Sequence, residues 1–111
     1  MCFHTAILYC KAEIPRPQKA AHLLKQICQE LHLSPISEPH ITYYPFPRHA
    51  YLIVLPIGQS HLSLETWPEI NTVRILIDSC KEINLDHLQE VVSEKLNTKD
   101  LKLEKVTTKW P

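Results

Sequence analysis

The sequence predicts an α+β fold, a two-layer sandwich in which two helices cover one face of a largely antiparallel sheet, in the order β-α-β-β-β-β-α-β. Two stretches carry apolar residues with helical spacing, six stretches have strand-like composition, and four of these strands follow one another with no helix between them. Short connections favour antiparallel pairing. A length of 111 residues is typical of one domain, so we expect a single domain over residues 1–111.

The first half of the chain predicts a strand, a helix and a proline-rich stretch. Residues 3–10 have the composition of a buried strand, and Pro15 and Pro17 stop this strand and open a helix. Ser34-Pro35 is expected to end the helix. The apolar positions of the helix recur with a spacing that lays one face on a sheet: Ala20, Ala21, Leu23, Leu24, Ile27, Cys28 and Leu31.

The middle of the chain predicts four strands, at residues 40–44, 50–57, 61–67 and 72–79. The stretch 50–57 is a continuous apolar run of the kind that is buried on both faces of a sheet. Residues 68–71 separate the last two strands, which predicts a hairpin with a four-residue loop.

A second helix and a last strand complete the prediction. Asn84 is a good N-cap, and a last strand is expected at about residues 101–108. The helix after Asn84 has a buried stripe: Leu85, Leu88, Val91, Val92 and Leu96. Because both helices cover the same face, the other face of the sheet is free, and we expect dimerisation through it.

Composition argues against several classes of partner. Twelve lysines and arginines balance twelve aspartates and glutamates. The chain therefore has no net positive charge that would attract nucleic acid or acidic membranes. No apolar run approaches the roughly 20 residues of a membrane span. Met1 does not begin a signal peptide, so we expect a cytoplasmic protein with reduced thiols at its four cysteines. The histidines share no metal-ligand spacing, and we expect no metal.

A single glycine, Gly58, precedes Ser60 by two residues, between a buried strand and a polar one. Glycine is most useful where the backbone takes a conformation that other residues resist or where something approaches closely. From composition alone, an ordinary turn, rather than a reactive one, is the favoured interpretation of the stretch 58–61 (Gly-Gln-Ser-His).

A longer motif favours the reactive interpretation. The run Ser60-His61-Leu62-Ser63-Leu64-Glu65-Thr66-Trp67-Pro68-Glu69, followed by Asp78-Ser79-Cys80, resembles the S-adenosylmethionine decarboxylases of bacteria and archaea. Members of that family carry Ser-His-(apolar)-(Ser/Thr)-(apolar)-His-Thr-(aromatic)-Pro-Glu before a Thr-Cys-Gly. Chain size, element order and a histidine in the opening strand, His4, are also similar.

The resemblance implies a cofactor made from the chain itself. A serine hydroxyl attacks the preceding carbonyl, the chain splits, and a pyruvoyl group remains that serves as an electron sink for decarboxylation. Here this implies cleavage between Gln59 and Ser60, a pyruvoyl group at residue 60 and no metal. It also implies Cys80 as proton donor and His61 as a catalytic neighbour.

The resemblance also implies a substrate site, in which Phe46 stacks on adenine, Glu69 binds the ribose hydroxyls and Trp67 lies nearby. Each residue has a structural alternative. Phe46 could be core, Glu69 a loop carboxylate, Cys80 a small buried hydrophobe and His61 a hydrogen-bonding strand residue.

Three positions depart from the family pattern, and all three bear on self-cleavage. Gln59 stands where a glutamate is usual, Leu52 where a serine assists, and Glu65 where a histidine serves as the processing acid. A loop at 68–71 places Glu65 opposite Arg74, and His61 opposite Asp78. Opposite charges at such positions predict a structural ion pair, although recognition of a new substrate by Glu65 and Arg74 is the competing interpretation.

Three functional hypotheses follow. The first is a pyruvoyl-dependent S-adenosylmethionine decarboxylase of polyamine (spermidine) biosynthesis, acting on a small-molecule substrate as a homodimer. The second is an unprocessed, non-catalytic paralogue that binds a metabolite or pairs with an active relative. The third is a pyruvoyl decarboxylase of a basic amino acid such as ornithine or arginine.

Overall fold

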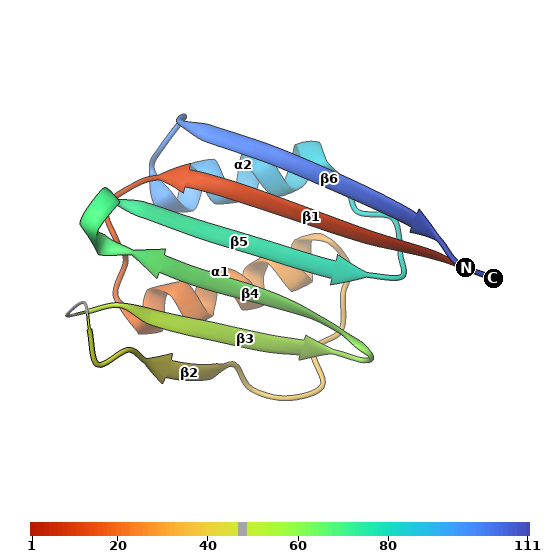
Figure 1. The fold of residues 1–111 in the computed structure, drawn as a ribbon, viewed down its shortest axis with the longest axis horizontal. Helices are drawn as coiled ribbons and strands as arrows, with labels where there is room; N and C mark the ends of the chain where they lie inside the picture. The colour runs from red at the N-terminus through yellow and green to blue at the C-terminus, as the bar shows by residue number, and fades with distance from the viewer. Residues whose placement is uncertain (47–48) are drawn as a thin grey trace.

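The computed structural model describes residues 1–46 and 49–111, and these residues form one six-stranded sheet with both helices on the same face (Figure 1). This arrangement confirms the predicted α+β sandwich. The strands are β1 Cys2–Lys11, β2 His40–Tyr43, β3 Tyr51–Ile57, β4 Ser60–Trp67, β5 Thr72–Ser79 and β6 Leu101–Lys109. The helices are α1 Pro17–Glu30, the 3-10 turn η1 Pro68–Ile70 and α2 Leu85–Leu96.

The strands lie in the order β2-β3-β4-β5-β1-β6, and each neighbouring pair is antiparallel. The first strand of the chain therefore lies inside the sheet, between β5 and β6 (Figure 1). Pairs formed by consecutive strands were predictable from loop lengths. The insertion of β1 was not, because it depends on contacts between distant parts of the chain.

Side chains alternate between the two faces of the sheet, as the period of a strand requires. One face packs on α1 and α2 and forms the core, with Leu8, Ile53, Leu64 and Ile75 fully buried. Figure 1 shows the other face uncovered, with the two helices behind the sheet. This uncovered face is called the open face below. Its strands carry apolar and polar side chains: Ile7, Tyr9, Leu52, Val54, His61, Ser63, Glu65, Trp67, Arg74, Leu76 and Asp78.

Helix α1 ends earlier than the sequence indicated. The prediction placed its end at Ser34-Pro35, but the last helical residue is Glu30. His32 takes a left-handed conformation (φ 57°), Leu33 N donates to the Cys28 carbonyl at 2.8 Å, and His32 N donates to Gln29 at 3.3 Å. These two bonds form a Schellman motif, which satisfies the last carbonyls of the helix. Glycine usually marks this motif in a sequence, and a histidine conceals it.

Helix α2 has the caps that its sequence predicts. The Asn84 side chain accepts a hydrogen bond from His87 N at 3.1 Å, which confirms the N-cap. Asn97 takes the left-handed conformation (φ 50°) at the other end, and Thr98 N donates to the Ser93 carbonyl at 3.1 Å. Among the residues described, no helix is long and apolar enough to cross a membrane.

Two hairpin turns lie at opposite ends of β4. The four-residue connection to β5 is confirmed: Pro68 starts η1, and Asn71 closes it in the left-handed conformation (φ 47°). The connection from β3 contains only Gly58 and Gln59. Gly58 has φ +66°, whereas Gln59 has no positive φ, a pattern that suits a type II′ hairpin turn with glycine first.

Candidate functional site

Two of the three positions that depart from the family pattern, Leu52 and Glu65, lie on the open face, on β3 and β4. The ladder pairs Glu65 with Arg74 and His61 with Asp78, as predicted from the loop length. It also pairs Leu52 of β3 with Glu65. These two departures from the family pattern, Leu52 and Glu65, are therefore direct neighbours, and Arg74 lies on the other side of Glu65.

Glu65 and Arg74 form the predicted ion pair. Arg74 Nη2 donates to both carboxylate oxygens of Glu65, at 2.8 and 2.9 Å, and the Arg74 side chain is 31% exposed and that of Glu65 is 18% exposed. The Arg74 guanidinium also lies 5.3 Å from the centroid of Trp67 and 6.0 Å from that of Tyr9. The hydrogen bond to Glu65 raises the pKa of Arg74, so the arginine is permanently charged. Glu65 consequently acts here as a hydrogen-bond acceptor.

The proposed cleavage bond lies at the end of a tight turn. Ser60 is the first residue of β4, pairs with Ile57 across the turn and is half-buried. Gln59 and Gly58 are exposed, and the space beside Gly58 is open, with no atom within 4 Å of where a Cβ would stand. The turn that precedes Ser60 is therefore open to solvent.

Cys80 lies at the same end of the sheet. It follows directly after β5, the strand that pairs with β4, and the pairing of His61 with Asp78 places it beside the turn. Its exposure argues against the alternative of a small buried hydrophobe. Cys10 and Cys28 are the buried cysteines. Burial raises the pKa of Cys10 to about 12 and that of Cys28 to about 11, so both thiols stay protonated.

The three predicted substrate-binding residues lie at the opposite end of β4. Trp67 ends the strand on the open face, Glu69 follows in η1, and Phe46 lies in the connection from β2 to β3. Phe46 is 86% exposed, which contradicts the alternative that it belongs to the core. In Figure 1 the β3–β4 turn lies at the right end of β4, and η1 lies at the left end.

These two groups lie far apart within a single subunit. Seven residue steps separate Ser60 from Trp67 along β4. At about 3.3 Å per residue this corresponds to about 23 Å between the two backbone positions. The sequence resemblance names both groups but does not show that they lie this far apart.

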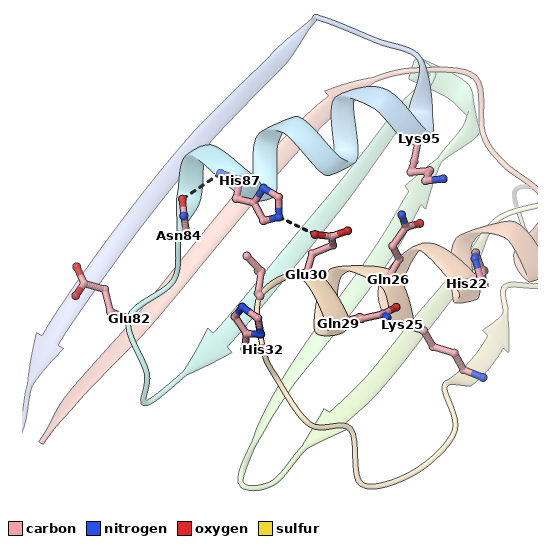
Figure 2. Close-up of a pocket in the computed structure, with 11 residues that line it drawn as sticks. His22, Lys25, Gln26, Gln29, Glu30, His32, Glu82, Asn84, His87 and Lys95 are labelled. Atoms are coloured by element: carbon pink, nitrogen blue, oxygen red, sulfur yellow. Dashed lines mark hydrogen bonds and ion pairs between the residues drawn. The ribbon is translucent and has the colours of Figure 1, made fainter.

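A groove between α1 and α2, on the other side of the molecule, was not predicted. It has a volume of about 960 Å³, and Figure 2 shows its lining side chains, with His87 of α2 directed at Glu30 of α1. His87 Nε2 lies 2.8 Å from Glu30 Oε2, and Glu90 lies 3.5 Å from Nδ1. The hydrogen bond to Glu30 raises the pKa of His87. The two partners are 57 residues apart in sequence, so no local pattern could have revealed this contact.

No group of three or more histidine, cysteine or carboxylate side chains within residues 1–46 and 49–111 is arranged to hold a metal ion. The four cysteines are free.

Comparisons with known proteins agree with the motif. A search of curated proteins returned no match. A crystal structure of the adenosylmethionine decarboxylase from Aquifex aeolicus is similar in fold, with a TM-score of 0.73 and 21% identity over 96% of this chain and 88% of that one. The family model for S-adenosylmethionine decarboxylase matches residues 6–109. With nearly its whole length matched, this chain belongs to the S-adenosylmethionine decarboxylase family.

Proposed function

We propose that this chain is a pyruvoyl-dependent decarboxylase that cleaves itself between Gln59 and Ser60 and acts on S-adenosylmethionine, in the synthesis of polyamines such as spermidine. One observation carries the proposal. Ser60 and Cys80, the family's precursor and proton-donor positions, lie on the ends of neighbouring strands, both within reach of solvent.

The residues at this end of the sheet fit a serine-derived pyruvoyl group. Cleavage would need attack of Ser60 Oγ on the Gln59 carbonyl carbon, which converts the amide to an ester. Elimination would then release the Gln59 carboxylate and leave a dehydroalanine at residue 60, and water would convert its imine form to the ketone with loss of ammonia. The ketone supplies an electron sink for decarboxylation. Cys80, exposed at the same end of the sheet, would hold the proton that the substrate carbon takes up after carbon dioxide leaves.

The substrate site is proposed to need two subunits. Ser60 and Glu69 lie at opposite ends of β4, so a second copy docked antiparallel on the open face would bring its Phe46 and Glu69 next to the first copy's Ser60. A twofold interface of this kind forms two equal sites. The open face, uncovered and partly apolar, suits such a contact.

Mass spectrometry under denaturing conditions tests self-cleavage. We expect two fragments, residues 1–59 and 60–111, in wild type, and one intact chain of 12.9 kDa in Ser60→Ala. Cys80→Ala should still be cleaved but should release little carbon dioxide from carboxyl-labelled S-adenosylmethionine. A wild-type chain that stays whole after prolonged incubation would refute the proposal. Ornithine and arginine in the same assay test the third hypothesis, decarboxylation of a basic amino acid.

Complementation tests the two-subunit site. Ser60→Ala and Glu69→Ala are each expected to be inactive alone. Mixed and reassociated, they should recover about one quarter of wild-type activity, since half the dimers are mixed and each mixed dimer has one complete site. Recovery is impossible if each subunit builds its own site, because no subunit in the mixture then has both residues.

A second function is favoured by the Glu65–Arg74 pair. Self-cleavage requires a proton donor, and the residue at the family's processing-acid position accepts two hydrogen bonds from a guanidinium instead. The alternative is an unprocessed chain that binds S-adenosylmethionine or pairs with an active relative. Calorimetry separates the two: binding of the intact chain to S-adenosylmethionine, with no cleavage, supports the alternative. If the intact chain neither binds nor captures an active relative, the alternative loses its support.

A further inference from the structure

Four side chains on the open face form a compact group whose position is fixed by the backbone. Arg74 of β5 lies between two strand neighbours in register, Tyr9 of β1 on one side and Glu65 of β4 on the other. Trp67 follows Glu65 by two residues and therefore points to the same face. Three paired strands hold these positions, so the group does not depend on loop conformation.

Tyr9, Glu65 and Trp67 surround the Arg74 guanidinium in the way that cation-binding sites surround a ligand. The carboxylate of Glu65 accepts at 2.8 and 2.9 Å, and the rings of Trp67 and Tyr9 lie 5.3 and 6.0 Å from the guanidinium carbon. A carboxylate and aromatic faces are the groups that recognise planar cations. We call Tyr9, Glu65 and Trp67 the cation cage.

The Arg74 guanidinium does not use all the hydrogen bonds that the cage offers it. Arg74 reaches both oxygens of Glu65 through a single nitrogen, Nη2, instead of the two parallel N–H···O bonds that a guanidinium can form. Its Nε is buried and makes no hydrogen bond. The backbone of β5 sets where the arginine stem begins, and a guanidinium free of that stem could turn to present two nitrogens.

We propose that the cation cage is a binding site for planar cations of the guanidinium class, which the chain fills with its own Arg74. The site is closed in the wild-type protein, so a cationic group of a ligand on the open face is not recognised at Glu65. Replacing residue 74 alone opens the site. The proposal does not depend on self-cleavage, but the cage lies on the face that the proposed dimer would cover, so binding is measured at a protein concentration at which gel filtration shows a monomer.

Calorimetry of Arg74→Ala with N-ethylguanidinium tests the proposal, because this compound replaces the atoms that the substitution removes. We expect N-ethylguanidinium to bind Arg74→Ala. Its affinity should be weaker by about tenfold or more for wild type, in which Arg74 occupies the Glu65 carboxylate, and for Arg74→Ala/Glu65→Gln, in which that carboxylate is absent. N-ethylurea, which has a similar shape and no charge, should not bind. Lys25→Ala is the matched control, because it empties an ion pair with Glu38 that lies outside the cage.

Three results would each overturn the proposal, and the third applies only if Arg74→Ala does not fold alone. One is a folded Arg74→Ala protein, verified by circular dichroism, that does not bind N-ethylguanidinium. Another is equal binding with and without the Glu65 carboxylate. If Arg74→Ala does not fold alone, N-ethylguanidinium should restore its cooperative thermal transition, and failure to do so also counts against the cage.

Discussion

The Glu65–Arg74 pair should be energetically coupled, and a double-mutant cycle measures this. The variants are Glu65→Ala, Arg74→Ala and the double substitution, and the quantity is the free energy of unfolding from urea denaturation. Breaking a fully buried ion pair destabilises by about 3–5 kcal/mol, whereas exposed pairs contribute about 0–1 kcal/mol. With 18% and 31% of the side chains exposed, solvent screening places this pair between the two.

The expected values follow from this intermediate exposure. We expect a coupling energy of about 1–2 kcal/mol for the pair. Arg74→Ala alone also loses its ring contacts, worth about 0.5–1 kcal/mol, and should destabilise the chain by about 2 kcal/mol in total. For a domain of this length that corresponds to a decrease of about 8 °C in melting temperature.

A second ion pair on the same face of the sheet is the control. Lys102 Nζ lies 3.6 Å from Glu104 Oε1 on the edge strand β6, with 75% and 49% of the side chains exposed. Its coupling should be about 0–0.5 kcal/mol. If the Glu65–Arg74 coupling is no larger than that of the control, the pair is not a structural unit, and both the cation cage and the argument for an unprocessed chain lose their basis.

Three further predictions each rest on one local feature of the structure. His87 has a raised pKa because Glu30, and secondarily Glu90, accept hydrogen bonds from its ring. Its stabilising contribution is therefore complete below the unfolded pKa of about 6.5 and is lost as pH rises through the folded pKa. The difference in melting temperature between wild type and His87→Gln should accordingly be larger at about pH 5.5 than at about pH 8.5. Gly58→Ala should destabilise by about 1 kcal/mol in chemical denaturation through backbone strain alone, because φ is +66° and the added methyl meets no atom; an unchanged midpoint would contradict the left-handed turn. The buried Thr66 hydroxyl makes two hydrogen bonds to the backbone of Tyr51 in β3. It donates to the Tyr51 carbonyl at 3.0 Å and accepts from the Tyr51 amide at 2.8 Å. Thr66→Val should therefore cost about 2–4 kcal/mol of unfolding free energy, and Thr66→Ser, which keeps the hydroxyl, should cost clearly less.

Local signals predicted most of the fold. Proline marked the start of α1, Asn84 marked the start of α2, and the spacing of Pro68 and Asn71 gave the register that pairs Glu65 with Arg74. These features depend on neighbours in sequence. The end of α1 was wrong because its stop signal is a left-handed histidine, a residue that seldom takes this role.

Features that depend on distant contacts could not be predicted. Tyr9 completes the group around Arg74 only because β1 inserts beside β5, and nothing in residues 1–11 specifies that neighbour. In the same way, the motif names Ser60 and Glu69 as one site, whereas their separation along β4 becomes clear only from the strand itself.

The position of β1 has a consequence for a nicked protein. A break after Gln59 leaves β1, α1, β2 and β3 in one piece and β4, β5, α2 and β6 in the other. Since β1 lies between β5 and β6, the two pieces are interleaved, and each supplies strands that the other needs to complete its hydrogen-bonding. The halves should elute together in gel filtration without denaturant, and separately expressed halves should reconstitute the sheet when refolded together.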